Sequence, residues 1–273
     1  MTWLAQPSAA DDQHLFDVSD RGLLLSDGVF TTALVVQGQV AFRDEHMERL
    51  QKDARAIGLD VNRQIVEEAV DINIIEQGHS AIRITITRGC GPRGIAPFAQ
   101  SNPTIVVSCQ PLGFMGAAEP KRLAVSSIRR NETSPTSRHK TLNYLDSILA
   151  FQEARERGFD DSIFLNTTGN ITCTTTMNIF GIFGDKLMTP RIEDGVLAGI
   201  ARAFILGVAH NQNLRTAVRA LSVDDLMSAD GVFLTNCLRG IVPVQAIEDR
   251  VFDTKVPMEL IRSWRSAVGL RVG

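Results

Sequence analysis

Cysteine is scarce in this chain of 273 residues, and the few present do not suggest a framework. No CxxC pair occurs, and no cysteine has a histidine at metal-ligand spacing. This pattern predicts reduced thiols of a cytoplasmic protein and no metal site, rather than disulfides. A long apolar run is missing too, because the weakly polar stretch 196–209 is too short to span a bilayer, so no membrane partner is expected. The four cysteines are Cys90, Cys109, Cys173 and Cys237.

A strong charge of one sign is also missing. The 28 basic and 31 acidic residues give a net charge of −3, so no nucleic-acid partner is expected. Residues 1–13 lack a basic region followed by an apolar run, so no signal peptide is expected. HExxH, GxSxG and Walker motifs are absent, which removes support for the chemistries they serve. The length allows one large or two modest domains.

Lysine is the scarcest basic residue, with five among 28. Four of them (Lys52, Lys121, Lys186 and Lys255) lie in contexts typical of solvated charges. Lys140 differs, because it lies between a polar loop and a predicted helix. A partly desolvated lysine loses its proton more readily and can form an imine with a carbonyl. The alternative is an ordinary cation at a helix start.

Strand and helix patterns mix along the chain without a strict βαβ alternation, which predicts an α+β fold. The segment 111–120 fits neither period and is bounded by prolines, which indicates an interdomain linker. The prediction is a small domain over 1–110 and a larger domain over 121–273. Among the predicted elements are a half-buried strand at 82–86, a strand at 104–108, a helix at 141–157, and a hairpin of 178–183 with 186–189.

Three features could contribute to an anion site. Arg49 lies off the apolar stripe of its predicted helix. The turn 195–201 brings free backbone N–H groups to a helix start, which suits a phosphate. The segment 231–237 ends a strand with small polar groups. Each feature is weak alone, because helices often begin with glycine and arginines usually face water.

An ordered set of motifs resembles the class IV aminotransferase family, the fold-type IV pyridoxal-phosphate enzymes. This family includes D-amino-acid and branched-chain aminotransferases, (R)-amine transaminases and aminodeoxychorismate lyase. Phe30-Thr-Thr and the glycine-rich loop 88–94 most resemble the lyase and, with the other motifs, cover nearly the whole chain in family order. The motifs lie at 19–22, 26–32, 46–50, 87–94, 139–145, 178–180, 189–190, 195–202, 235–237 and 243–244.

The resemblance implies an architecture and partners. It implies a small N-terminal α/β sandwich domain and a larger C-terminal domain with a barrel-like sheet. It implies pyridoxal 5'-phosphate as the cofactor, a small-molecule amino donor and a 2-oxo acid as substrates, and a homodimer. Under the same resemblance, Lys140 is the Schiff-base lysine that moves a proton between the substrate Cα and the cofactor. Arg49 falls on the phosphate-binding arginine.

The resemblance assigns further residues to the cofactor and the substrate. Ile200 and Ala201 would give backbone N–H groups to the phosphate, and Asn236 and Cys237 would complete the phosphate cup. On the substrate side it implies Phe30 and Thr31 as lining residues and Arg93 as the guanidinium that binds a carboxylate. The alternatives are that Phe30 fills the core and that Arg93 braces its loop.

One position departs from the family. A glutamate normally stands five residues before Asn178 and keeps the cofactor's pyridine nitrogen protonated, but this chain has Cys173 there. A thiol is a weak hydrogen-bond donor, so the hypothesis is slow transamination or chemistry that needs a weaker electron sink, such as elimination. The alternative is that water or a neighbouring polar group takes over the role, with Thr174, Thr175 and Thr176 as the nearby candidates.

Three functions therefore remain open. The first is an aminotransferase that exchanges an amino group between an amino acid or amine and a 2-oxo acid. The second is a lyase of the aminodeoxychorismate type that releases pyruvate. The third is a cofactor-binding relative with little activity.

Overall fold

The computed structural model describes residues 2–4, 16–96, 98, 102–113, 116–212 and 214–271. The chain divides into two compact units. The N-terminal unit comprises residues 1–114 with 139–143, and the C-terminal unit comprises 115–138 with 144–273. Each unit combines helices with a sheet, which confirms the predicted α+β class. Within the described residues, none of the helices has the length and apolar character needed to cross a membrane.

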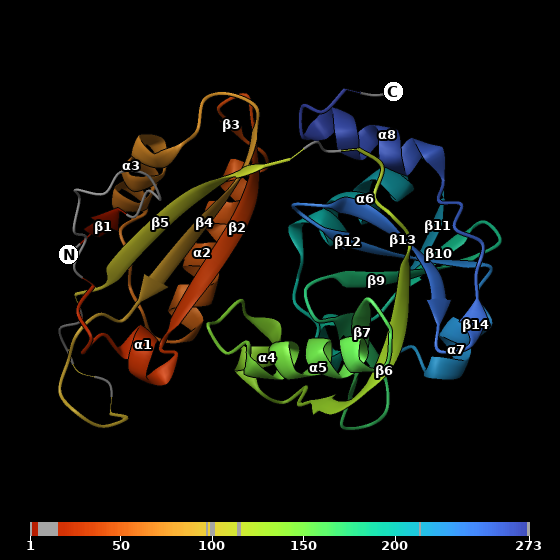
Figure 1. Cartoon of the computed structure of the whole chain (residues 1–273), viewed down its shortest axis with the longest axis horizontal. Coiled ribbons are helices and arrows are strands. Elements are labelled where there is room, and N and C mark those ends of the chain that lie inside the picture. The colour runs from red at the N-terminus through yellow and green to blue at the C-terminus, as the bar shows by residue number, and fades with distance from the viewer. Residues whose placement is uncertain are drawn as a thin grey trace. The chain divides into compact units, whose positions relative to one another are not determined.

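The N-terminal unit is built on a five-stranded sheet (Figure 1). Its neighbours pair antiparallel, except that the edge strand β1 runs parallel to β5. The central pair β2 and β4 is in register from Gly28 opposite Thr87 to Val36 opposite His79. In sheet order the strands are β1 (Thr2–Leu4), β5 (Thr104–Leu112), β4 (His79–Thr87), β2 (Gly28–Val36) and β3 (Gln39–Val40).

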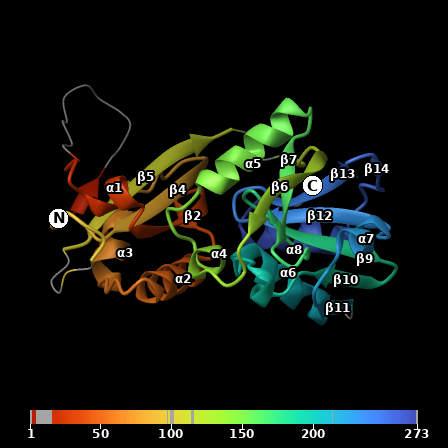
Figure 2. The ribbon, with the colours of Figure 1, turned by 90° about the horizontal axis from the view of Figure 1, so that it is seen from below.

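Two helices of the N-terminal unit, α2 (Arg43–Ala56) and α3 (Arg63–Asn73), lie along one face of this sheet (Figure 2). A short helix, α1 (Arg21–Leu25), precedes β2. The predicted strand over 82–86 is confirmed within β4, where alternate isoleucines are buried in the core with Met47 and Leu50 of α2. The apolar residues of α2 face the sheet. The polar residues between them are therefore held at the edge of the core of the N-terminal unit.

The C-terminal unit contains a nine-stranded, curled sheet (Figure 1). The hairpin predicted at 178–189 is confirmed, because β9 and β10 pair antiparallel around Gly184, which has a φ of +57°. The strands in order are β11 (Arg215–Val218), β10 (Lys186–Thr189), β9 (Asn178–Phe183), β12 (Gly231–Asn236), β13 (Gly240–Ile247), β6 (Lys121–Arg130), β7 (Asp161–Asn166) and β8 (Ile171–Thr174), with β14 (Arg250–Val251) beside β13.

Helices pack on the curled sheet of this unit. The hydroxyl of Ser162 in β7 donates to the Ala150 carbonyl of α5 at 2.8 Å, which ties that helix to the sheet. Phe204 of α6 and Trp264 of α8 meet edge to face at 5.6 Å between ring centroids. The helices are α4 (Pro135–Arg138), α5 (Leu145–Glu156), α6 (Ile200–Asn211), α7 (Val223–Met227) and α8 (Met258–Ala267), with a 3₁₀ turn at Ile192–Asp194.

Two segments differ from their predicted form. The helix predicted at 141–157 begins only at Leu145, because Thr141 pairs with Val29 of β2 and Leu142 donates its N–H to Gly28. The strand predicted at 104–108 continues to Leu112, opposite His79. The first two residues of the predicted linker 111–120 therefore lie in β5, and residues 114 and 115 of it lie outside the described residues.

Candidate active site

The segment that contains Lys140 is held against the N-terminal unit by its main chain. The Lys140 carbonyl accepts the N–H of Phe30 in β2 at 2.9 Å. On the other side, the Lys140 N–H donates to Asp53 Oδ2 at 3.1 Å. The side chain is half-buried, with Nζ 4.4 Å from the centroid of the Phe30 ring. The backbone of Lys140 is thus fixed by a strand and a helix while its amine lies beside an aromatic face.

Asp53 of α2 is the residue that links this helix to the lysine segment. Its carboxylate is 3 % exposed, and its second oxygen lies 2.7 Å from Nδ1 of His139. Both oxygens are therefore engaged by consecutive residues of one segment. Sequence reasoning missed Asp53, because 87 residues separate it from Lys140 and nothing in the local pattern of α2 marks it.

Arg49 takes part in a buried chain of hydrogen bonds that begins one turn before Asp53. Its Nη2 donates to Thr31 Oγ1 at 2.8 Å, and the same oxygen lies 2.6 Å from Nδ1 of His46. Thr31 Oγ1 therefore accepts from Arg49, and the tautomer of the His46 ring sets whether the hydroxyl donates to Nδ1 or accepts from it. Burial, together with the charges of Arg49 and Lys140, lowers the pKa of His46 to about 3, so His46 is neutral.

Two buried nitrogens of this chain are unsatisfied. Arg49 Nε and His46 Nε2 have no hydrogen-bond partner among the described residues. A buried donor without an acceptor costs about 1–3 kcal/mol. An anionic group that reached this part of the N-terminal unit would satisfy such donors, so the residues present fit an anionic ligand.

In the C-terminal unit, the start of α6 offers a second anion-binding element. Gly199 is the N-cap and has no side chain, so the first N–H groups of the helix, which begins with Ile200 and Ala201, have no side-chain acceptor. A Cβ at Gly199 would lie 2.0 Å from Asn178 Oδ1, so any larger residue would displace the Asn178 side chain. Asn178 itself donates to the Leu197 carbonyl at 2.9 Å and thereby fixes the turn.

The end of β12 lies next to Asn178, since Thr235 is its partner in the register with β9. The Thr235 hydroxyl is buried with no hydrogen-bond partner among the described residues, and sequence reasoning did not single it out. Asn236 uses its side-chain oxygen within its own turn, accepting from Leu238 N at 3.1 Å and Arg239 N at 2.7 Å. Cys237 is partly exposed. The unpaired hydroxyl and the helix start together fit a phosphate.

Cys173, which stands where the family has a glutamate, has a neighbour that the sequence did not predict. Cys173 in β8 is buried, and Arg130 of β6 donates from Nη1 to its sulfur at 2.9 Å. Two of the hydroxyls considered as substitutes make other hydrogen bonds. Thr174 Oγ1 accepts from Met177 N at 3.2 Å, and Thr175 Oγ1 donates to Asp161 at 2.6 Å. The group beside Cys173 is therefore a guanidinium, which no local pattern revealed because it lies 43 residues away.

The residues predicted to meet substrate all lie in the N-terminal unit. Phe30 is 5 % exposed, with the Arg83 guanidinium carbon 3.6 Å and Lys140 Nζ 4.4 Å from its ring centroid. Thr31 is fully buried, and its hydroxyl is engaged by Arg49 and His46. Arg93 is exposed in the loop after β4 and makes no hydrogen bond or ion pair with any residue that the structure describes.

The sequence and the fold were compared with known proteins. Residues 28–247 match the model of the family "Amino-transferase class IV". A putative branched-chain-amino-acid aminotransferase of Methanocaldococcus jannaschii is 31% identical over 90% of this chain and 87% of its own. An aminodeoxychorismate lyase of Bacillus subtilis is 28% identical, over 84% and 80%. The crystal structure of a putative 4-amino-4-deoxychorismate lyase from Legionella pneumophila superposes with a TM-score of 0.83 at 28% identity, over 97% and 99%.

Proposed function

Because the chain belongs to the class IV aminotransferase family, we propose that it exchanges an amino group between an amino acid or amine and a 2-oxo acid, with Lys140 as its catalytic residue. The family's aminotransferases and lyases use pyridoxal phosphate, and the chain is an enzyme of one of these two kinds. The observation that carries the proposal is the fixed backbone of Lys140, held between Phe30 and Asp53.

In this proposal several residues hold the cofactor. Lys140 attaches it covalently, and Arg49 binds its phosphate. The N–H groups of Ile200 and Ala201 bind the phosphate too, assisted by the end of β12 at Asn236 and Cys237. When bound, pyridoxal phosphate supplies an aldehyde that condenses with amines and a ring that accepts the electrons released at the substrate Cα. The unsatisfied nitrogens of Arg49 and His46 and the open start of α6 support this assignment.

Lys140 has a second role in the reaction. Once released from the cofactor, the Lys140 Nζ would take the proton from the substrate Cα and pass it to C4′ of the cofactor. The substrate is oriented by two groups in this proposal: the Arg93 fork binds its carboxylate, and Phe30 lines the space near the Lys140 amine. Thr31 supports this side of the site through Arg49 and His46, on the other face of β2. The aromatic face of Phe30 also keeps water away from the amine that moves the proton.

Cys173 and Thr174 complete the proposed cofactor contacts. A thiol that already accepts a hydrogen bond from Arg130 is poorly placed to neutralise a protonated ring nitrogen, and the nearby guanidinium charge disfavours a second positive charge. We propose that the cofactor's ring nitrogen therefore stays unprotonated and that amino transfer is slow relative to a glutamate-bearing relative.

A lyase of the aminodeoxychorismate type is the second candidate. Cys173 and Arg130 favour it, because elimination of pyruvate needs a weaker electron sink than transamination. The similarity to aminodeoxychorismate lyases of known sequence or structure supports it as well.

The deciding experiment adds single amino donors to the holoenzyme and follows conversion of the cofactor to its pyridoxamine form. Conversion by at least one donor, reversed by a 2-oxo acid, is the result expected of an aminotransferase. Pyruvate release from aminodeoxychorismate without a second keto acid identifies the lyase instead. A holoenzyme that neither converts to the pyridoxamine form nor releases pyruvate is the cofactor-binding relative with little activity, and the proposal is then wrong.

We further propose that the enzyme is a cytoplasmic homodimer. Helix α5 supports a dimer, because it exposes four large apolar side chains, more than a solvated helix face needs. These residues are Leu145, Ile148, Leu149 and Phe151, at 66%, 53%, 44% and 44% exposure. Light scattering coupled to gel filtration tests the assembly. A dimer that dissociates in the Ile148→Lys variant supports the proposal, and a monomeric wild type overturns it.

A further inference from the structure

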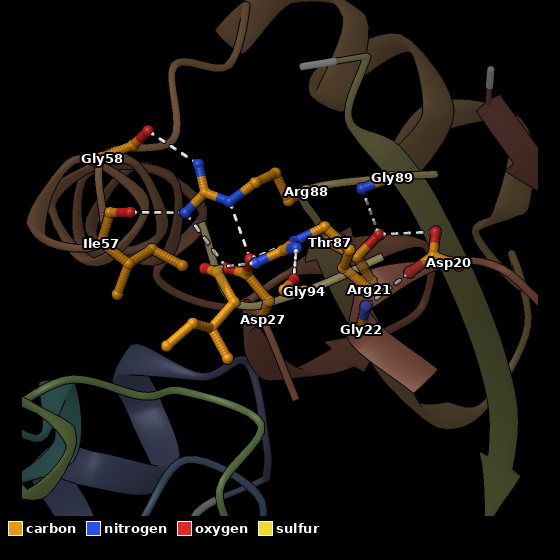
Figure 3. Close-up of polar contacts among 11 residues, drawn as sticks. Asp20, Arg21, Gly22, Asp27, Ile57, Gly58, Thr87, Arg88, Gly89 and Gly94 are labelled. Atoms are coloured by element: carbon orange, nitrogen blue, oxygen red, sulfur yellow. Dashed lines mark hydrogen bonds and ion pairs between the residues drawn. The ribbon is translucent and has the colours of Figure 1, made fainter. Parts of the chain in front are cut away.

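Two buried arginines of the N-terminal unit share one carboxylate (Figure 3). Arg21 Nε and Arg88 Nε each donate to Asp27 Oδ2 at 2.8 Å, and Arg88 Nη2 donates to Oδ1 at 3.1 Å. Burial by itself raises the pKa of Asp27, but the hydrogen bonds and charges of Arg88 and Arg21 outweigh it and hold that pKa below its usual value. The carboxylate is therefore ionised, and the cluster is a fixed, charge-assisted network.

The remaining donors of the two arginines go to different segments. Arg88 donates to the carbonyls of Ile57 at 2.6 Å and Gly58 at 3.0 Å, directly after α2. Arg21 donates to Gly94 O at 2.7 Å and to the next carbonyl, of Ile95, at 3.2 Å. The carboxylate thus binds both ends of the loop 88–94: Arg88 is its first residue, and the Arg21 side chain reaches the carbonyls at its far end, Gly94 and Ile95.

This loop is closely packed on its N-terminal side. Gly89 has a φ of +79°, and a Cβ there would lie 2.0 Å from the Asn102 carbonyl oxygen. A Cβ at Gly91 would lie 2.0 Å from the ring of Phe98. The guanidinium carbon of Arg21 lies 5.9 Å from the centroid of that same ring. Gly89 and Gly91 allow the close packing at the start of the loop, and Arg21 binds the carbonyls at its end.

Arg93 lies next to the carbonyls that Arg21 binds. It directly precedes Gly94, whose carbonyl Arg21 binds and whose φ of +115° suits glycine. The Arg93 side chain makes no hydrogen bond or ion pair with the described residues that could orient it. The backbone is therefore what fixes the starting point of the Arg93 side chain, and Arg21 binds the carbonyls of the next two residues.

We propose that Arg21 is the positioning residue for the substrate carboxylate: by binding the carbonyls of Gly94 and Ile95 it presents Arg93 to the substrate. This inference rests on the proposed function, in which Arg93 binds that carboxylate. Arg21 touches no substrate itself. Arg88 has similar burial and the same carboxylate partner, but its side chain binds the carbonyls that follow α2 and not those of Gly94 and Ile95. It therefore provides a control for loss of the buried network at the start of the loop.

The test compares Arg21→Lys and Arg21→Gln with Arg88→Lys, using pyruvate as the 2-oxo acid substrate. Lysine keeps a positive charge beside Asp27 but lacks the planar fork that reaches two carbonyls. Both Arg21 variants are expected to raise the KM for pyruvate by about tenfold, the effect of a lost charged hydrogen bond, with kcat changed by less than about twofold. Arg88→Lys is expected to lower the Tm and leave the KM unchanged.

Trypsin gives a readout that needs no turnover. It cleaves after exposed arginines, so the rate of cleavage between Arg93 and Gly94, followed by mass spectrometry, reports the order of the loop. This rate is expected to increase in both Arg21 variants and not in Arg88→Lys. Pyruvate is expected to protect the bond in the wild-type holoenzyme at a lower concentration than in Arg21→Lys.

The outcomes separate this inference from the proposed function. An Arg93→Gln variant that raises the KM for pyruvate, together with Arg21 variants that do not, overturns the positioning role and leaves the proposed function standing. An Arg93→Gln variant with an unchanged KM overturns the carboxylate role of Arg93 and the positioning role with it. Equal effects of Arg21→Lys and Arg88→Lys on KM and on cleavage reduce Arg21 to a general stabilising residue and also overturn the inference.

Discussion

The carboxylate of Asp53 holds Lys140 by its main chain: Oδ2 accepts the lysine N–H at 3.1 Å. The other oxygen lies 2.7 Å from the ring of His139, so a single buried side chain of α2 orders both residues. A lysine that must be both an attachment point and a proton carrier needs a fixed origin for its long side chain, because small displacements at a reacting centre are costly. Asp53 and the strand pairing with Phe30 provide that origin.

Removing this carboxylate is expected to impair the enzyme. Asp53→Ala is expected to lower turnover by about tenfold or more, because a buried hydrogen bond to a charged group contributes roughly 1.5–3 kcal/mol. Asp53→Asn keeps an oxygen for the Lys140 N–H and is expected to lose less. Turnover and the visible absorption of the bound cofactor measure both effects. Asp60→Ala, which removes an exposed carboxylate shortly after α2, is the control. Equal behaviour of Asp53→Ala and Asp60→Ala would show that Asp53 positions nothing.

Thr31 is expected to act through Arg49. Thr31→Val keeps the shape of the side chain and removes the oxygen that Arg49 and His46 share. The loss of this acceptor is expected to raise the Kd for pyridoxal phosphate by about tenfold. Equilibrium titration of the apoenzyme with the cofactor measures the Kd. Thr32→Val, the neighbouring position of β2 whose side chain points to the other face, is expected to bind as the wild type does. A normal Kd in Thr31→Val would contradict the role of the hydrogen-bonded chain.

Cys173 is expected to limit the rate of amino transfer. Cys173→Glu places a carboxylate beside Arg130 and is expected to accelerate the half-reaction with an amino donor on the order of tenfold, by favouring a protonated ring nitrogen. Cys173→Ser, which can still accept from Arg130, is expected to resemble the wild type. Stopped-flow absorbance follows the half-reaction and the cofactor spectrum together. If both remain unchanged in Cys173→Glu, the electron-sink hypothesis is wrong.

The sequence predicted the elements whose pattern is local and missed the contacts that join distant segments. The isoleucine alternation identified β4, and the turn at Gly184 identified the β9–β10 hairpin. The helix after Lys140 was placed too early, because the strand-like pairing of Thr141 with Val29 is a tertiary interaction that no local propensity encodes. β5 extends beyond its predicted end for the same reason, since β4 provides a partner as far as His79.

The candidate site shows the same division. Lys140 and Arg49 were recognised from their motifs, and the structure finds both in ordered hydrogen-bonded surroundings of the N-terminal unit. The residues that hold them or lie beside the proposed site, Asp53 and Arg130, were missed because each acts across more than 40 residues of sequence. A carboxylate or an arginine of this kind has no distinguishing neighbour in the sequence, and only its buried partner reveals its role.

His46 is expected to make stability depend on pH. The folded protein holds its pKa at about 3, against 6.5 for the unperturbed group, so the unfolded chain binds a proton that the folded chain does not. Stability from this source is complete above pH 6.5 and falls by up to about 1.4 kcal/mol per pH unit as the pH decreases toward 3. His46→Asn, which retains an acceptor for Thr31, is expected to show a shallower slope. Urea unfolding between about pH 6 and pH 4 measures it. Parallel slopes would contradict a buried, neutral His46.

The central claim is that Lys140 binds pyridoxal phosphate covalently. Borohydride reduction of the holoenzyme fixes any cofactor held through an imine, and peptide mass spectrometry then locates it. One pyridoxyl group per chain is expected on the peptide that contains Lys140, and none in a Lys140→Ala variant. A label on Lys52, Lys121, Lys186 or Lys255, or an unlabelled Lys140 in an enzyme that shows the cofactor's visible band, would contradict it.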